Sequence, residues 1–134
     1  MKNTTIEIIK KYYKSFNEGD RKCFLDLLAE NVVHEINHGN QEIGKKLFEQ
    51  FLEKMDKHYK EKVVDLYVFS SEDGERAAAE FFIEGVYLTT DPQLPPAKGQ
   101  KYRLRCGAFF TVHNTHITRV TNYYNLKQWL HQIS

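Results

Sequence analysis

The sequence has few of the residues that build cross-linked or metal-rich proteins, with two cysteines, Cys23 and Cys106, among 134 residues. Two are too few for a disulfide framework or a zinc cage, so both are expected to be apolar fillers in a reducing compartment. No apolar run is long enough to span a bilayer, and Glu7 interrupts the start of the chain where a signal peptide would be apolar. We therefore expect a cytoplasmic protein with no membrane partner.

An excess of charge of either sign is also lacking. The 19 Lys and Arg residues against 18 Asp and Glu residues leave a formal net charge of +1. Because no basic block stands out, nucleic acid is not an expected partner. The hydrophobic fraction of 41% and aromatic fraction of 13% are typical of an ordinary globule, which excludes disorder. The length predicts a single domain over residues 1–134.

Proline is scarce, and all three prolines lie in the segment Thr89–Gly99. Proline has no backbone N–H to donate to a sheet, so this segment is predicted to be a loop. It is longer than a hairpin connection needs, and we expect it to gate or border a cavity.

The spacing of apolar residues predicts an α+β fold. Asp20 is expected to cap the second helix and Gly19 to end the first, while Thr4 and Glu7 resemble a capping box. The predicted helices are Thr4–Phe16, Arg21–Glu30, Glu42–Lys60 and Leu126–Ile133. The predicted strands are Asn31–Ile36, Val63–Phe69, Glu75–Leu88, Gln100–His113 and His116–Asn125, in a mostly antiparallel sheet.

The long strands predict a sheet with one wholly apolar face and one mixed face. Phe81 and Ile83 with Tyr102, Leu104, Ala108 and Phe110 share the apolar face. The mixed face combines Glu80, Phe82, Glu84, Arg103, Arg105 and Phe109. If the mixed face is exposed to water, the apolar face lies under the helices. If the mixed face looks toward the helices, it lines a cavity and the apolar face is a subunit interface. Periodicity alone leaves both arrangements open.

The turn at Asn114 and Thr115 predicts the pairing of the last two strands. It sets His113 opposite His116, so that Gly107 faces Asn122, Phe109 faces Val120 and Arg105 faces Tyr124. These residues would then belong to the mixed face.

Segments along nearly the whole chain resemble the nuclear transport factor 2-like superfamily of cone-shaped α+β domains. Within it they resemble the ketosteroid isomerase and SnoaL-like polyketide cyclase groups, and in particular the ketosteroid isomerase-related proteins. The segments are 12–20 (YYKSFNEGD), 32–37 (VVHEIN), 77–81 (AAAEF), 107–110 (GAFF) and 120–126 (VTNYYNL).

The resemblance implies roles for particular positions. Tyr12 matches the oxyanion-donor tyrosine of the isomerases. Their general-base aspartate matches Ile36, next to Glu35, and their second oxyanion donor matches Gly107. The catalytic aspartate of the cyclases matches Asn125, whose amide cannot act as a base. The resemblance also implies that the mixed face lines the pocket, through positions that include Phe82, Val120, Asn122 and Tyr124.

The same resemblance implies a homodimer that packs sheet against sheet. The apolar face would then supply the interface, through Phe81, Ile83, Tyr102, Leu104, Ala108, Phe110 and Tyr123.

Two carboxylates, Glu80 and Glu84, would face such a pocket, where burial disfavours the charged form and can tune an acid or base. Alternatively they form cross-strand ion pairs, Glu84 with Arg105 or Glu80 with Arg103. We take Glu80 as the predicted acid–base residue.

His34 is a candidate proton shuttle beside Tyr12, since imidazole titrates near neutral pH. A purely structural, hydrogen-bonded histidine is the alternative. The spacing of His34, Glu35 and His38 does not match a metal site. No cofactor motif is present.

The resulting expectation is a small-molecule pocket protein without cofactor or metal. It would act as an isomerase or cyclase by proton transfer on an apolar carbonyl compound, or would bind such a ligand without catalysis. Glu80, Tyr12 and His34 are the predicted catalytic residues. The predicted ligand contacts are Phe82, Glu84, Arg105, Phe109, Val120, Asn122 and Tyr124.

Overall fold

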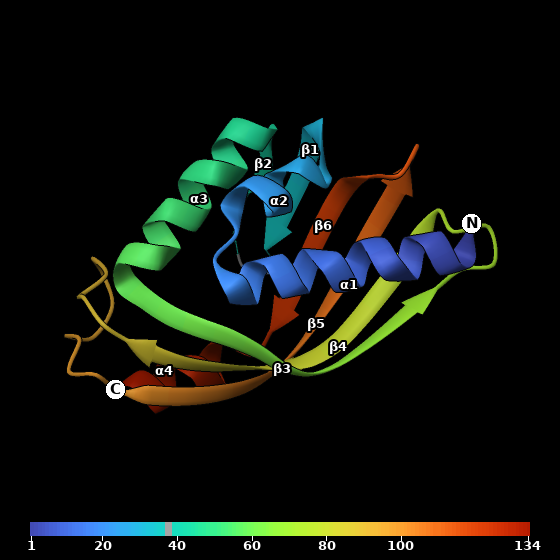
Figure 1. Ribbon diagram of the computed structural model, residues 1–134. Coiled ribbons are helices and arrows are strands. Elements are labelled where there is room, and N and C mark those ends of the chain that lie inside the picture. The colour runs from blue at the N-terminus through green and yellow to red at the C-terminus, as the bar shows by residue number, and fades with distance from the viewer. Residues whose placement is uncertain (37–38) are drawn as a thin grey trace.

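The computed structural model describes residues 1–36 and 39–134 and shows helices packed on a strongly curved sheet (Figure 1). The helices are α1 (Lys2–Glu18), α2 (Arg21–Asp26), α3 (Lys45–His58) and α4 (Leu126–Ile133). The strands are β1 (Leu28–Ile36), β2 (Gln41–Ile43), β3 (Tyr59–Ser70), β4 (Arg76–Tyr87), β5 (Lys101–His113) and β6 (His116–Tyr124). The predicted α+β layout is confirmed.

Across the described residues the sheet has six strands, in the order β2-β1-β6-β5-β4-β3. Strand β1 runs parallel to β6, and the other neighbouring pairs are antiparallel. Helix α1 lies across the sheet, α3 covers the end beside β1, and α4 packs against β5 (Figure 1). This arrangement is consistent with the predicted cone-shaped fold.

Local signals account for most helix boundaries, and one prediction among them is wrong. Gly19 ends α1 with a φ of 69°, and the Asp20 side chain accepts from the Cys23 N–H at 3.1 Å. The predicted capping box does not form, because α1 already begins at Lys2, and the hydroxyl of Thr5 donates to the Gly74 carbonyl. That bond ties the start of the chain to the turn between β3 and β4.

The helices α2 and α3 are shorter than predicted. Helix α2 ends at Asp26, because Leu28 already pairs with Ile117 in the sheet. Helix α3 ends at His58, and the chain continues directly into β3, which therefore starts four residues before the predicted Val63. Sheet pairing overrides helix propensity at both points. Asn37 and His38 lie outside the described residues.

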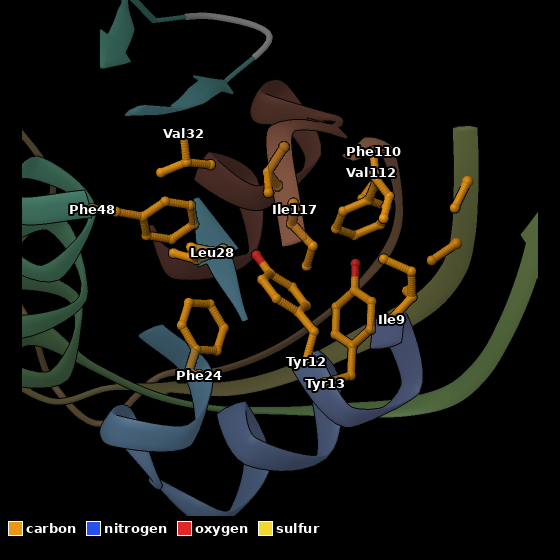
Figure 2. Packing of buried hydrophobic residues seen from close by; sticks show 14 of the residues in the cluster. Ile9, Tyr12, Tyr13, Phe24, Leu28, Val32, Phe48, Phe110, Val112 and Ile117 are labelled. Carbon is orange, nitrogen blue, oxygen red and sulfur yellow. The ribbon is translucent and has the colours of Figure 1, made fainter. Parts of the chain in front are cut away.

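The apolar face of the sheet is covered by the helices. Figure 2 shows Tyr12 and Tyr13 projecting from α1 toward Phe110 and Ile117 of the sheet. Phe110 and Ile117 are completely buried. Periodicity alone did not decide which face of the sheet packs against the helices. The resemblance implied that the mixed face lines the pocket, and this prediction is wrong, because the apolar face is the one that the helices cover. The packing of α1 buries the face with the larger apolar area, as the hydrophobic effect requires.

The predicted subunit interface is wrong for the same reason. Phe81, Tyr102, Leu104, Ala108 and Phe110 are each at most 5% exposed within one chain, so they cannot form a surface for a partner. Two members of the predicted set differ: Ile83 is half-buried and lines the cavity, and Tyr123 is 47% exposed.

The pairing of β5 with β6 differs from the prediction by one residue. Asn114 and Thr115 form the predicted turn, both with positive φ, and His113 pairs with His116. A bulge then shifts the register between Thr111 and Val112, so Gly107 pairs with Tyr123 instead of Asn122. A shift of one residue moves every later side chain to the opposite face. Asn122 consequently joins the buried face.

The outer face of the sheet carries cross-strand ion pairs. Glu84 pairs with Arg103 at 3.1 Å, and Glu80 pairs with Arg105 at 2.6 Å. Both guanidinium groups lie over the ring of Phe82, at 3.8 and 4.7 Å from its centroid. This arrangement confirms the alternative in which the two glutamates form cross-strand ion pairs. The partners are exchanged, however, since the prediction paired Glu84 with Arg105 and Glu80 with Arg103.

None of the helices in the described part of the chain is both long enough and apolar enough to cross a membrane.

Candidate functional site

A cavity of about 550 Å³ lies between the inner face of the sheet and helices α1, α3 and α4. Its walls are mainly aromatic and aliphatic, with a few polar groups among them. Polar or titratable lining residues on the helices, the loop and the inner face of the sheet are Tyr12, Tyr13, His34, Lys54, Tyr59, Glu61, Asp91, Gln93, Cys106, Asn122, Tyr124 and Trp129. A chamber of this size and composition suits a small, largely apolar organic molecule.

Glu61, near the start of β3, is the carboxyl group best placed for chemistry. It is half-buried, and it lines the cavity among aromatic side chains. The hydroxyl of Tyr102, on β5, donates a hydrogen bond to Glu61 Oε2 at 2.5 Å. Strand β4 lies between these two strands, so the tyrosine side chain must cross a whole strand to reach the carboxyl group.

Gly85 makes that crossing possible. It pairs with Glu61 on one side and with Tyr102 on the other, so the three residues stand in one row across the sheet. A Cβ atom added at Gly85 would lie 2.5 Å from both Cε2 and the hydroxyl oxygen of Tyr102. The ring of Tyr102 therefore occupies the space that any other residue at this position would fill.

Burial raises the pKa of the Glu61 carboxyl above its usual value, and the hydrogen bond from Tyr102 opposes that shift in part. The accessible part of Glu61 faces the cavity, so the surrounding apolar walls disfavour its charged form. A raised carboxyl pKa is the property that a general acid or base needs near neutral pH.

A second polar group lies on the β1 side of the cavity, separated from Glu61 by three strands. His34 Nε2 lies 3.4 Å from Asn122 Nδ2, and the imidazole stacks on Phe48 with 4.2 Å between ring centroids. Burial lowers the pKa of His34 to about 4, so the ring is neutral at pH 7. Because the Asn122 amide can only donate through Nδ2, Nε2 is the acceptor and Nδ1 carries the proton.

Tyr12 completes this second group. Its side chain is 6% exposed and lines the cavity. Burial raises its pKa, so the phenol stays protonated and is a hydrogen-bond donor. Tyr12, His34 and Asn122 can position a carbonyl or hydroxyl group of a ligand but provide no carboxylate.

The loop between β4 and β5 borders the cavity, as predicted. Asp91, Pro92, Gln93 and Leu94 line it. The hydroxyl of Tyr59 donates to Asp91 Oδ2 at 2.8 Å, which ties the loop to β3 next to Glu61.

Four of the ten predicted site residues line the cavity: Tyr12, His34, Asn122 and Tyr124. Val120 is on the inner face but is completely buried in the core. The remaining five, which all belong to the outer face, are Glu80, Phe82, Glu84, Arg105 and Phe109. Asn122 reaches the cavity only through the bulge, which moves it to the face opposite the predicted one.

The sequence interpretation missed Glu61 because it ended the helix at Lys60 and began the strand at Val63. The sequence did contain a signal for it. Tyr59 and Glu61 stand at every second position before Val63, so they extend the inward-facing side of β3 toward its N-terminal end. Within the described residues no cluster of three or more His, Cys, Asp or Glu side chains is arranged to hold a metal ion.

Comparison with protein families identifies the relationship. The SnoaL-like domain model matches residues 9–120, which is most of the chain. The chain belongs to the SnoaL-like domain family. No curated protein matches the sequence.

Solved structures agree with this assignment. A candidate polyketide cyclase from Pseudomonas putida is 48% identical, with 97% of this chain and 98% of that chain covered and a TM-score of 0.95. Another candidate polyketide cyclase, from Xanthomonas campestris, is 45% identical over 99% and 98% of the chains, with a TM-score of 0.97. A nuclear transport factor 2-like protein from Burkholderia xenovorans shares only 16% identity over 100% and 98%, with a TM-score of 0.80, and shows the common fold. The fold predicted from the resemblance is thus confirmed.

Proposed function

We propose that the protein binds a small, largely apolar carbonyl compound in the cavity and catalyses proton transfer on it without a cofactor. The observation that supports this most directly is Glu61, a carboxyl group with a raised pKa that faces an aromatic chamber. The names of the two similar structures, both candidate polyketide cyclases, agree with a cyclase.

In the proposed reaction the Glu61 carboxylate removes a proton from the carbon next to a ligand carbonyl. The electron pair of the broken C–H bond moves onto the carbonyl oxygen, which gives an enolate and a protonated Glu61. Isomerisation follows when Glu61 returns the proton to another carbon. Cyclisation follows when the enolate carbon attacks a second carbonyl of the same molecule and Glu61 protonates the new alkoxide. The Tyr102 hydrogen bond holds the carboxyl group in place throughout.

A binding protein without catalysis is the second candidate. The positions that match the isomerase acids, Ile36 and Gly107, do line the cavity, and neither carries a carboxyl group. A protein that lacks both carboxyl groups could still bind a ligand in the cavity without catalysing the reaction.

Exchange of carbon-bound hydrogen separates the two candidates. We would incubate the protein with 2-tetralone in D₂O and follow deuterium incorporation next to the carbonyl by NMR. An enzyme accelerates exchange, and Glu61→Gln should reduce the rate on the order of a hundredfold, which is typical of a lost general base. Glu80→Gln is the matched control, since it makes the same change on the outer face. Binding without exchange by the unaltered protein would favour the second candidate, and equal rates in both variants would exclude Glu61 as the base.

We also propose a homodimer through the outer face of the sheet. Tyr67, Phe69, Phe109 and Tyr123 are each about half exposed there, at 47% to 59%. The rings of Phe109 and Tyr123 contact each other with centroids 5.7 Å apart. Several exposed aromatic side chains on one face of a sheet are typical of a protein–protein interface.

A further inference from the structure

A second cavity, of about 420 Å³, adjoins the first one. It is formed by the last turns of α3 and the start of the loop after β4, and we call it the outer cavity. Its lining residues are Lys54, Lys57, His58, Thr89, Thr90, Asp91, Pro92 and Gln93. Lys54, Asp91, Pro92 and Gln93 line the aromatic cavity as well, so the two spaces meet along these residues.

The two spaces differ in chemistry. The aromatic cavity is enclosed by rings and aliphatic side chains, whereas the outer cavity carries two lysines and two threonines. A molecule that fills both would need an apolar part and a polar part. The polar part would lie between α3 and the loop.

The charges of the outer cavity favour an anion. Lys54 and Lys57 stand at positions i and i+3 of α3, where two positive side chains repel each other. Neither forms an ion pair within residues 1–36 and 39–134. The neighbouring acid Asp56 is already engaged by Arg21. Glu53, one turn before Lys57 on α3, forms no ion pair with it in the described part of the chain, so both lysines remain unpaired on this wall.

The acidic and histidine residues of this cavity are engaged elsewhere. The carboxylate of Asp91 accepts the hydroxyl proton of Tyr59. His58 Nδ1 lies 2.9 Å from the Thr89 carbonyl oxygen, which it can contact only as a donor. Asp91 offsets one positive charge, and one remains in excess.

We propose that the ligand is an amphipathic organic acid whose carboxylate lies in the outer cavity beside Lys54 and Lys57. Its apolar part enters the aromatic cavity and brings a reactive carbon to Glu61. This inference rests on the proposed function for the inner end of the ligand. The proposal also fixes the orientation of the ligand. The ionised form of Glu61 repels the carboxylate of the ligand from the aromatic cavity, so the carboxylate stays in the outer cavity.

The positive residues at the end of α3 have a structural alternative. Cations in the last turn of a helix interact favourably with its carbonyl groups. That role predicts lower stability after substitution and no change in ligand preference, which a binding measurement distinguishes.

The test compares 4-cyclohexylbutanoate with its neutral amide, 4-cyclohexylbutanamide. Trp129 is the single tryptophan of the sequence and lines the aromatic cavity, so its fluorescence reports occupancy there. We expect the acid to bind roughly fivefold more tightly than the amide, since solvent-accessible ion pairs contribute up to about 1 kcal/mol each. The preference should decrease when salt is raised from 10 to 300 mM, because salt screens exposed charges.

Lys57→Met should abolish most of the preference and leave amide affinity unchanged, since Lys57 lines the outer cavity and not the aromatic one. Lys46→Met is the matched control, since Lys46 lies on α3 but lines neither cavity. Equal affinity of acid and amide for the unaltered protein would overturn the inference while leaving the apolar pocket intact. A failure of both probes to bind would instead count against the proposed function. An equal loss of preference in both lysine variants would assign the effect to overall charge and overturn the site.

Discussion

The row formed by Glu61, Gly85 and Tyr102 leads to a prediction for Gly85→Ala. The added Cβ would lie within 2.5 Å of three atoms of Tyr102, the hydroxyl oxygen among them, whereas ordinary contacts begin near 3.4 Å, so the ring must move by about 1 Å. That displacement stretches the 2.5 Å hydrogen bond to Glu61 close to the 3.5 Å limit and effectively breaks it.

The net effect on stability follows from two opposing contributions. Loss of a hydrogen bond to a carboxyl group costs about 1.5–3 kcal/mol. Replacing a strand glycine by alanine returns about 0.5–1 kcal/mol through the unfolded chain. We expect the free energy of unfolding to decrease by about 1–2 kcal/mol. The pKa of Glu61 should rise further, because the bond from Tyr102 lowers it in the unaltered protein.

Urea unfolding and the pH profile of 2-tetralone exchange measure the two effects. Gly107→Ala is the control, since a Cβ there would meet nothing closer than 3.8 Å, and we expect no loss of stability. Tyr102→Phe should shift the pH profile in the same direction as Gly85→Ala, and the double variant should be less than additive. Unchanged stability and an unchanged pH profile in Gly85→Ala would refute the reasoning.

Three further predictions concern His34, the loop and the outer face. Since the pKa of His34 falls from 6.5 to about 4 on folding, the unfolded chain binds the proton more tightly. Stability should therefore fall by up to about 3 kcal/mol between pH 6.5 and 4, and His34→Gln should flatten this part of the urea-unfolding profile. Deleting Gln93 and Leu94 should weaken binding of 4-cyclohexylbutanoate severalfold with little change in the thermal midpoint. Phe109→Glu combined with Tyr123→Glu should convert a sedimenting dimer into monomers at micromolar concentration.

Each of these predictions has a contrary outcome. A pH profile that His34→Gln leaves unaltered would mean that other groups dominate acid unfolding. Unchanged affinity after the deletion would show that the loop does not contribute to binding. A monomeric unaltered protein at micromolar concentration would remove the reason for placing an interface on the outer face.

The sequence by itself determined the order and type of most elements. The helical spacing of apolar residues and the alternation in β4 and β5 are local properties, and they are strong enough to predict these segments. The proline-containing loop and its position beside the cavity followed from proline chemistry. Alternation also showed correctly which side chains of β4 and β5 share a face.

Tertiary structure decided which face became the cavity and which residues meet in it. Alternation makes the two faces of a strand equivalent until a helix packs on one of them, so the role of Glu80 depended on where α1 lies. The bulge near Thr111 moved Asn122 to the inner face through a single extra residue. Glu61 and Tyr102 are 41 residues apart and meet only because Gly85 has no side chain between them. A contact of this kind depends on three strands in register, and no local pattern contains that information.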